Sequence, residues 1–186
     1  MRPLRALATT TAAGGCLLVA ACGGNPTPAP APKPSPSASA SASATPTPPA
    51  LPAAAKEKTK AGAIATARHF LSAVNFAGQS GDTEPLRASY ISYCTRCAAL
   101  ADSIDETYRK GGSYVGGLWT PQAVKFYAIK NNVAFVDALV KYDRQEWTPA
   151  RGAKVRVFPA SERNLKAFNL RWTAAGWRVS ALDPNK

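Results

Sequence analysis

The stretch 124–142 reads VKFYAIKNNVAFVDALVKY and decides the fold. In its first five residues, apolar side chains alternate with Lys125 and Tyr127, which is the pattern of a half-buried strand. Two asparagines at 131–132 predict a turn, and residues 133–142 predict a longer second strand of nearly continuous apolar character. We therefore expect an antiparallel hairpin here.

More strands are predicted C-terminal to this hairpin. Residues 144–152 have the composition of a loop, and strands are expected at about 153–158, 164–172 and 177–182. Gly176, after an alanine, is expected to turn the last two strands into a hairpin.

N-terminal to this hairpin, the spacing of the apolar residues changes from the alternation of a strand to the period of a helix. A first amphipathic helix is predicted to stop at Gly78, a short second helix to begin at Asp82, and a third to end at the glycine pair 111–112. The apolar positions of the first helix are Ala63, Ile64, Ala67, Phe70, Leu71 and Val74. Three helices followed by four or five antiparallel strands predict an α+β domain over residues 56–186.

His69 is the only histidine of the chain. At 100° per residue it falls on the side of the first helix opposite the apolar positions. We therefore expect it to face solvent and to take no part in catalysis.

The first 55 residues are predicted to contain an export signal followed by a tether. Arg2 and Arg5 precede a short apolar stretch that ends in small residues before Cys22, so residues 1–21 have the parts of an export signal. The cysteine after such a cut resembles the bacterial lipobox, which implies an acylated Cys22. Residues 22–55 then form a tether rich in Pro, Ala, Ser and Thr, which has almost nothing to bury. The alternative is simple secretion, with Cys22 incidental.

The chain of 186 residues has a formal net charge of +12 at pH 7. In an exported protein this charge favours anionic lipid headgroups or an anionic envelope polymer as partners over nucleic acid. The alternative is a solvated basic face with no specific partner. One histidine and four cysteines exclude a His-rich metal centre. We predict no metal site and no cofactor.

A set of glycines, cysteines and aromatic residues carries a resemblance to a known family. Its members are Gly81-Asp82, Leu86, Cys94-Thr95-Arg96-Cys97, Ile104, Tyr108, Gly111-Gly112, Gly116-Gly117-Leu118-Trp119 and the terminal strand 176–180. Over residues 58–184 the chain resembles a family of uncharacterised actinobacterial lipoproteins. The resemblance implies a nuclear-transport-factor-2-like cone, in which a curved antiparallel sheet wraps round the helices and leaves an open pocket. It implies no activity.

Cys94 and Cys97 form a Cys-x-x-Cys pair. Outside the cytoplasm such a pair is expected to form a structural disulfide that holds the corner between the second and third helices. A redox pair is the alternative, because a thiolate at a helix N-terminus has a lowered pKa. A zinc site would lack ligands.

Two further sets of residues are candidates for a site. Asp137 lies among apolar residues of its strand, where a raised pKa would suit an acid or base, although an outward-facing aspartate is the simpler interpretation. Six aromatic residues are expected near the mouth of the implied pocket, where they either line a ligand site or pack the core. They are Tyr90, Tyr93, Tyr108, Tyr114, Trp119 and Tyr127.

These observations favour a non-enzymatic lipoprotein on the outer face of the cell membrane that binds a ligand or a partner protein, with a dimer possible. One alternative is a pocket enzyme of isomerase or dehydratase type that uses Asp137. Another is a thiol–disulfide factor that uses Cys94 and Cys97.

Overall fold

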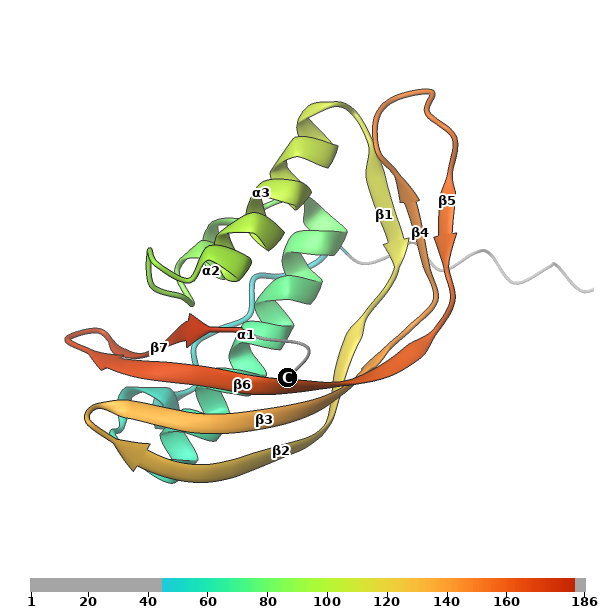
Figure 1. Cartoon of the computed structure of the whole chain (residues 1–186). Helices are drawn as coiled ribbons and strands as arrows, with labels where there is room; N and C mark the ends of the chain where they lie inside the picture. The colour runs from blue at the N-terminus through green and yellow to red at the C-terminus, as the bar shows by residue number, and fades with distance from the viewer. Residues whose placement is uncertain (1–44, 183–186) are drawn as a thin grey trace, which may run out of the picture. The chain divides into compact units, whose positions relative to one another are not determined.

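The computed structural model describes residues 45–182, with the side chains of 163–167 excepted. The predicted signal peptide, Cys22 and most of the predicted tether lie outside the described residues. The described part is an α+β domain in which helices precede two antiparallel sheets (Figure 1). Among the described helices, none is both long and apolar enough to span a bilayer.

Helix α1 (Lys60–Ser80) is the longest helix of the described domain. The Thr59 hydroxyl caps its start by accepting a hydrogen bond from the Gly62 amide at 3.0 Å. Gly81 ends it with a left-handed φ of 78° and donates its amide to Ala77. The predicted stop at Gly78 is therefore wrong by three residues, because Gly78 keeps a helical backbone and Gly81 supplies the left-handed cap.

Two further helices follow. Helix α2 (Glu84–Arg87) is a single turn, and α3 (Thr95–Arg109) is the third helix that the sequence predicted. Arg87 joins them, since its guanidinium lies 2.6 Å from carboxylate oxygens of both Asp102 and Asp105.

The strands form two sheets, where the sequence predicted one sheet of four or five strands. The larger sheet has the order β2-β3-β6-β7, with β2 (Trp119–Lys130), β3 (Val133–Tyr142), β6 (Ser161–Thr173) and β7 (Gly176–Ala181). The smaller sheet has the order β1-β4-β5, with β1 (Ser113–Gly116), β4 (Gln145–Thr148) and β5 (Arg156–Phe158). The predicted Asn-Asn turn is confirmed, with positive φ at both asparagines.

Each strand of the smaller sheet continues a strand of the larger one. The chain passes from one sheet to the other at three places, residues 117–118, 143–144 and 159–160. Trp119 pairs with Tyr142 at the end of the larger sheet, and Gly116 pairs with Gln145 at the start of the smaller sheet. The crossings therefore lie side by side in neighbouring strands. The result is a long, sharply bent sheet with the helices on its inner side (Figure 1).

The core lies between α1, α3 and the inner face of the larger sheet. In β3 the buried positions are Ala134, Val136, Ala138 and Val140, and the intervening residues face away. This alternation is the period-2 pattern of a strand with one covered face. Phe70 of α1 meets Phe168 of β6 edge to face at 5.4 Å between ring centroids.

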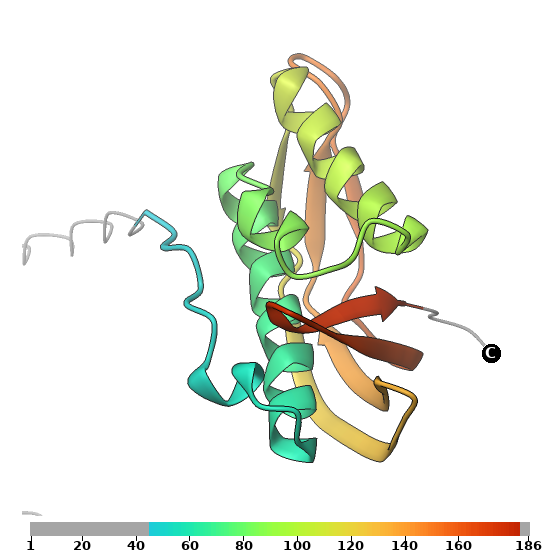
Figure 2. The ribbon, with the colours of Figure 1, turned by 90° about the vertical axis from the view of Figure 1, so that its left-hand side faces the viewer.

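Residues 45–59, here called the N-terminal strap, run along α1 (Figure 2). They include the short 3₁₀ helix η1 (Ala53–Lys56), in which Ala55 is fully buried. Gly62 permits this approach, because a Cβ there would overlap the carbonyl oxygens of Ala54 and Glu57. The last eleven residues of the predicted tether, 45–55, are thus part of the compact domain, and η1 contacts both α1 and β7.

The strap also explains why the prediction for His69 is wrong. His69 is only 9% exposed, because the side of α1 opposite the core is covered. Burial lowers the pKa of His69 below its usual value, and the charge of Arg178 lowers it further against a hydrogen bond to the Ala50 backbone.

Candidate ligand-binding site

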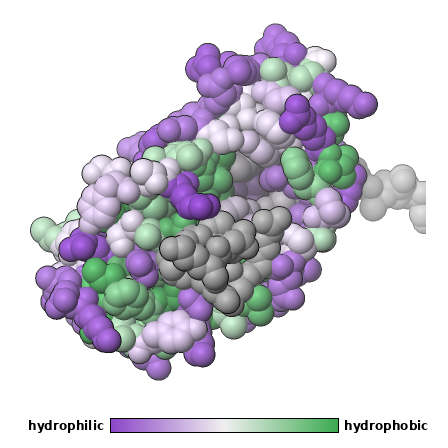
Figure 3. Space-filling view, in the orientation of Figure 1, coloured by the Kyte–Doolittle hydropathy of each residue, from purple (hydrophilic) through white to green (hydrophobic). Residues whose placement is uncertain are grey.

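A pocket of about 250 Å³ lies between α1, α3 and the smaller sheet. Figure 3 shows the corresponding hollow in the surface between α3 and the strands β1, β4 and β5. Its walls are mainly apolar and aromatic. They are formed by Val74, Asn75, Gly78, Leu100, Ser103, Ile104, Tyr114, Gly116, Gly117, Leu118, Trp119, Gln145, Trp147 and Phe158.

The outer wall is an aromatic surface built by cross-strand pairing. Tyr114 of β1 pairs with Trp147 of β4, and their rings stack with centroids 6.2 Å apart and planes 7° from parallel. Phe158 of β5 lies 6.4 Å from the Trp147 ring. Alternation along each strand turns these three rings toward the helices.

A pair of glycines turns the chain at the lip of this wall. Gly116 and Gly117 have φ values of 70° and 72°, in the left-handed region that side chains rarely adopt. A Cβ on Gly117 would also overlap the side-chain amide of Gln145. The glycine pair thus both makes the bend and leaves room for Gln145, which has no hydrogen-bond partner among the described residues.

Asn75 of α1 fixes the start of β2 to the helix. Its amide nitrogen donates to the Trp119 carbonyl at 3.1 Å, and its Oδ1 accepts from the Trp119 amide at 2.7 Å. One side chain therefore satisfies both backbone groups of Trp119 at the point where the sheet bends. Trp119 is further held by an edge-to-face contact with Tyr142 at 4.8 Å.

Thr107 of α3 satisfies the polar atoms behind the aromatic wall. Its buried hydroxyl accepts the Trp147 indole N–H at 3.1 Å, lies 3.0 Å from the Tyr114 hydroxyl and donates to the Ser103 carbonyl. Tyr114 and Trp147 thus keep their polar ends bonded to α3 while both side chains line the pocket.

Gly78 gives the pocket part of its volume. It lines the pocket from α1, and a Cβ built on it would meet no atom within 4 Å. Its backbone is held in place because the Tyr108 hydroxyl donates to its carbonyl at 2.7 Å. A larger side chain at this position would therefore extend into the empty space.

The lining of the pocket is mostly apolar. Among the described residues that line it, Tyr114 is the only one with a titratable side chain, and the other polar side chains are two amides, the Ser103 hydroxyl and the indoles of Trp119 and Trp147. Nor do the described residues bring together three acidic, histidine or cysteine side chains that could hold a metal ion.

Comparison with known proteins identifies the chain at the level of its family. The model of a family of unknown function, DUF6318, matches residues 36–183, which is most of the chain. The chain belongs to the DUF6318 family. No curated protein matches it. The matched region of this DUF6318 protein contains the whole described domain, so the pocket lies within the part of the chain that the family model covers.

Two of the six predicted aromatic residues, Tyr114 and Trp119, line the pocket of the DUF6318 domain. The other four lie elsewhere. Tyr108 packs behind Gly81, where burial raises the pKa of its hydroxyl, and Tyr90 makes a bridge to β7. Tyr93 is 58% exposed, and Tyr127 lies on the outer face of the larger sheet.

Asp137 is also on that outer face and does not line the pocket. The Tyr127 hydroxyl donates to its carboxylate at 2.7 Å, an interaction that raises the pKa of Tyr127, and Lys125 is its neighbour across the strand pair. The structure therefore gives Asp137 no place as an acid or base in this pocket, and it agrees with the simpler interpretation of an outward-facing aspartate.

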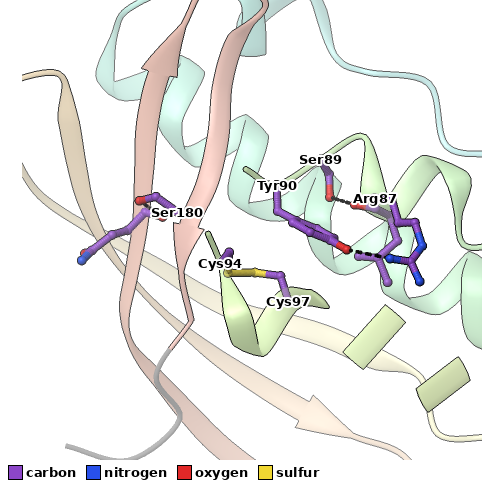
Figure 4. The surroundings of a disulfide bond; sticks show 8 residues. Arg87, Ser89, Tyr90, Cys94, Cys97 and Ser180 are labelled. Atoms are coloured by element: carbon purple, nitrogen blue, oxygen red, sulfur yellow. Dashed lines mark hydrogen bonds between the residues drawn. A yellow bond between two sulfur atoms is a disulfide. The ribbon is translucent and has the colours of Figure 1, made fainter. Parts of the chain in front are cut away.

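Cys94 and Cys97 are joined by a disulfide at the start of α3 (Figure 4). Both are buried. The loop before them is bonded to the edge strand β7, because the Val179 amide donates to Ser89 and the Val179 carbonyl accepts from Ile91. The disulfide thus lies at the corner where the sequence placed it, away from the pocket lining.

Sequence reasoning missed Asn75, Gln145, Trp147 and Phe158. The segment 144–152 was expected to be a loop, whereas β4 occupies its first half, so the pairing of Trp147 with Tyr114 was not foreseen. A signal was present in the alternation of Gln145 and Trp147 with Glu146 and Thr148, but it spans only four residues.

Proposed function

We propose that this DUF6318 protein is a lipid-anchored protein on the outer face of the cell membrane, whose domain binds a small, largely apolar ligand without transforming it. The observation that carries the binding role is the pocket itself, with an aromatic outer wall, an open position at Gly78 and no acidic, basic or histidine side chain among its described lining residues. Pockets of this character are typical of ligand sites.

The anchoring part of the proposal rests on the sequence. The export signal before Cys22 supports an acylated N-terminus, and two or more acyl chains give stable attachment where one chain gives only marginal binding. The resemblance to actinobacterial lipoproteins supports the same location. The formal net charge of +12, of which Arg2 and Arg5 of the export signal supply +2, supports attraction of the basic remainder to the anionic surface of an envelope.

The finer description of the fold is also a proposal. The sharp bend of the sheet and the helices on its inner side support a nuclear-transport-factor-2-like cone. The position of the pocket, between the helices and the far half of the bent sheet, agrees with the open pocket that such a cone implies.

Native mass spectrometry of the protein gently extracted from the membranes of its own host tests the proposal. We expect the mass of acyl chains on Cys22 and a retained small-molecule adduct. A Cys22→Ser variant should be released from membranes, and a fully membrane-bound variant would contradict the anchor. An adduct that persists in a Gly78→Leu variant would contradict the pocket as its site.

A further inference from the structure

Arg156 lies on the inner face of β5, beside the pocket. Strand alternation places Arg156 and Phe158 on one face, with Val157 on the other, and Phe158 lines the pocket. Pairing places Arg156 next to Trp147, whose far neighbour on the same rung is Tyr114. Tyr114, Trp147 and Arg156 therefore lie side by side across the smaller sheet, from β1 to its open edge at β5.

The Arg156 guanidinium lies over the Trp147 ring, 5.1 Å from its centroid. This cation–π contact holds the side chain against the aromatic wall but satisfies none of its N–H donors with an acceptor. Among the described residues, no carboxylate pairs with Arg156, whereas Arg144, in the crossing just before β4, is paired with Glu146 at 2.6 Å.

The surrounding charge reinforces this single cation. Residues 144–158, which contain β4, β5 and their connection, include four basic residues and one acidic residue, and that acidic residue is the Glu146 already paired. The Arg156 guanidinium is therefore the cation that the structure places beside the pocket at β5, while the interior lining carries no charged side chain. An anionic group at the rim would gain charge-assisted hydrogen bonds without leaving water completely.

Resting on the proposed binding function, we infer that the ligand is an amphiphilic anion. Its apolar body would lie in the pocket against Trp147, Phe158 and Trp119. Its single anionic group, a carboxylate, sulfonate or phosphate, would lie at the rim. There it would accept hydrogen bonds from the N–H groups of the Arg156 guanidinium. Gln145 would provide a neutral hydrogen-bonding group at the base of the same wall.

Two fluorescent probes with one shared body test this inference. 8-Anilinonaphthalene-1-sulfonate carries a sulfonate, and N-phenyl-1-naphthylamine has the same aromatic body without it. We expect Arg156→Gln to weaken binding of the sulfonate by about tenfold or more, as loss of a charged hydrogen bond implies, and to change binding of the neutral dye less than about twofold. Lys154→Gln is the matched control, because it removes an exposed charge from the same segment.

Gly78→Leu separates failure of the inference from failure of the proposed function. We expect it to remove binding of both dyes by filling the pocket. If it does so while Arg156→Gln leaves the sulfonate unaffected, the pocket stands and the anionic specificity is overturned. Equal losses of both dyes in Arg156→Gln would mean that arginine acts only through Trp147, which also overturns it. Undiminished binding of both dyes to Gly78→Leu would contradict the pocket itself.

Discussion

The indole N–H of Trp177 donates to the carbonyl of Glu57 across 2.9 Å, which fastens the last strand to the strap before α1. The ring is 2% exposed and meets Trp172 edge to face at 5.2 Å. One residue of β7 therefore both fills the core and connects segments 120 residues apart in the chain.

Trp177→Ala is expected to lower the free energy of unfolding by about 3–5 kcal/mol, because it leaves a large cavity. Trp177→Phe keeps most of the packing and leaves the Glu57 carbonyl without its donor, so we expect a loss of about 1–3 kcal/mol. Urea denaturation followed by circular dichroism measures both. Tyr93→Ala, at an exposed position, serves as the control, and a loss for Trp177→Ala no greater than for this control would contradict the structure.

Gly78 and Gly81 are predicted to respond oppositely to alanine. Gly78 has a helical backbone with open space at its Cβ, so Gly78→Ala should raise the free energy of unfolding by about 0.5–1 kcal/mol. Gly81 has positive φ, and its Cβ would meet the Tyr108 ring at 2.6 Å, so Gly81→Ala should destabilise by more than about 1 kcal/mol. Thermal melts of the two variants decide this, and a change of the same sign in both would refute it.

Thr107→Val tests the hydroxyl behind the aromatic wall. Valine keeps the shape of threonine, but the Trp147 indole N–H loses its acceptor, at a cost of about 1 kcal/mol for this partly buried group. The loosened ring should also bind 8-anilinonaphthalene-1-sulfonate more weakly. Thr120→Val, at an exposed position of β2, is expected to stay within about 0.5 kcal/mol of the wild type. Equal effects of the two substitutions would argue against the role of Thr107.

His69 is expected to make stability depend on pH. The pKa of His69 is lowered in the folded protein from the usual histidine value of about 6.5, chiefly by burial, so between the folded and unfolded pKa values the unfolded chain binds more protons. Stability from this group is therefore complete above about pH 6.5 and falls as the pH drops through and below that value. Denaturation midpoints measured from pH 7.5 to pH 5 should decline, and His69→Gln should flatten the decline. An unchanged slope in that variant would exclude His69 as the source.

The buried disulfide is expected to be structural. Cys94→Ser combined with Cys97→Ser should cost about 2 kcal/mol, the entropic value for so short a loop, and should leave dye binding in place because neither residue lines the pocket. A reduction potential below about −300 mV would agree with a structural bridge. A value in the range of thiol–disulfide exchange factors would instead revive the redox alternative.

The sequence allowed the order of elements to be predicted wherever a period ran long enough. The first and third helices, the Asn-Asn hairpin and the final hairpin were all found in this way. The smaller sheet was not, because β1, β4 and β5 are three or four residues long and their pairing depends on contacts distant in sequence. His69 was misplaced for a related reason, since helical periodicity reports the face toward the core and gives no sign of a strap on the opposite side.

The same limit applied to the pocket. Tyr114 and Trp119 were predicted together with four other aromatic residues near the mouth of the implied pocket, but Tyr93 and Tyr127, chosen on the same signal, lie on the surface. What separates the two groups is cross-strand register, which one sequence alone does not contain. Asp137 illustrates this point, since the face it occupies depends on which neighbours of β3 are covered by α1.

The bend of the sheet separates the residues that form the buried core from those that surround the pocket. Within the described residues, every fully buried core side chain comes from α1, α2, α3, β3, β6, β7 or the segments beside them, and none comes from β1, β4 or β5. The smaller sheet instead supplies the rings, the amide and the cation around the pocket. Substitutions on the pocket side of the smaller sheet would therefore leave every fully buried core position of the described residues unchanged. Under the proposed binding function, they would alter ligand preference separately from the core, with the three chain crossings at the bend as the boundary between the two parts.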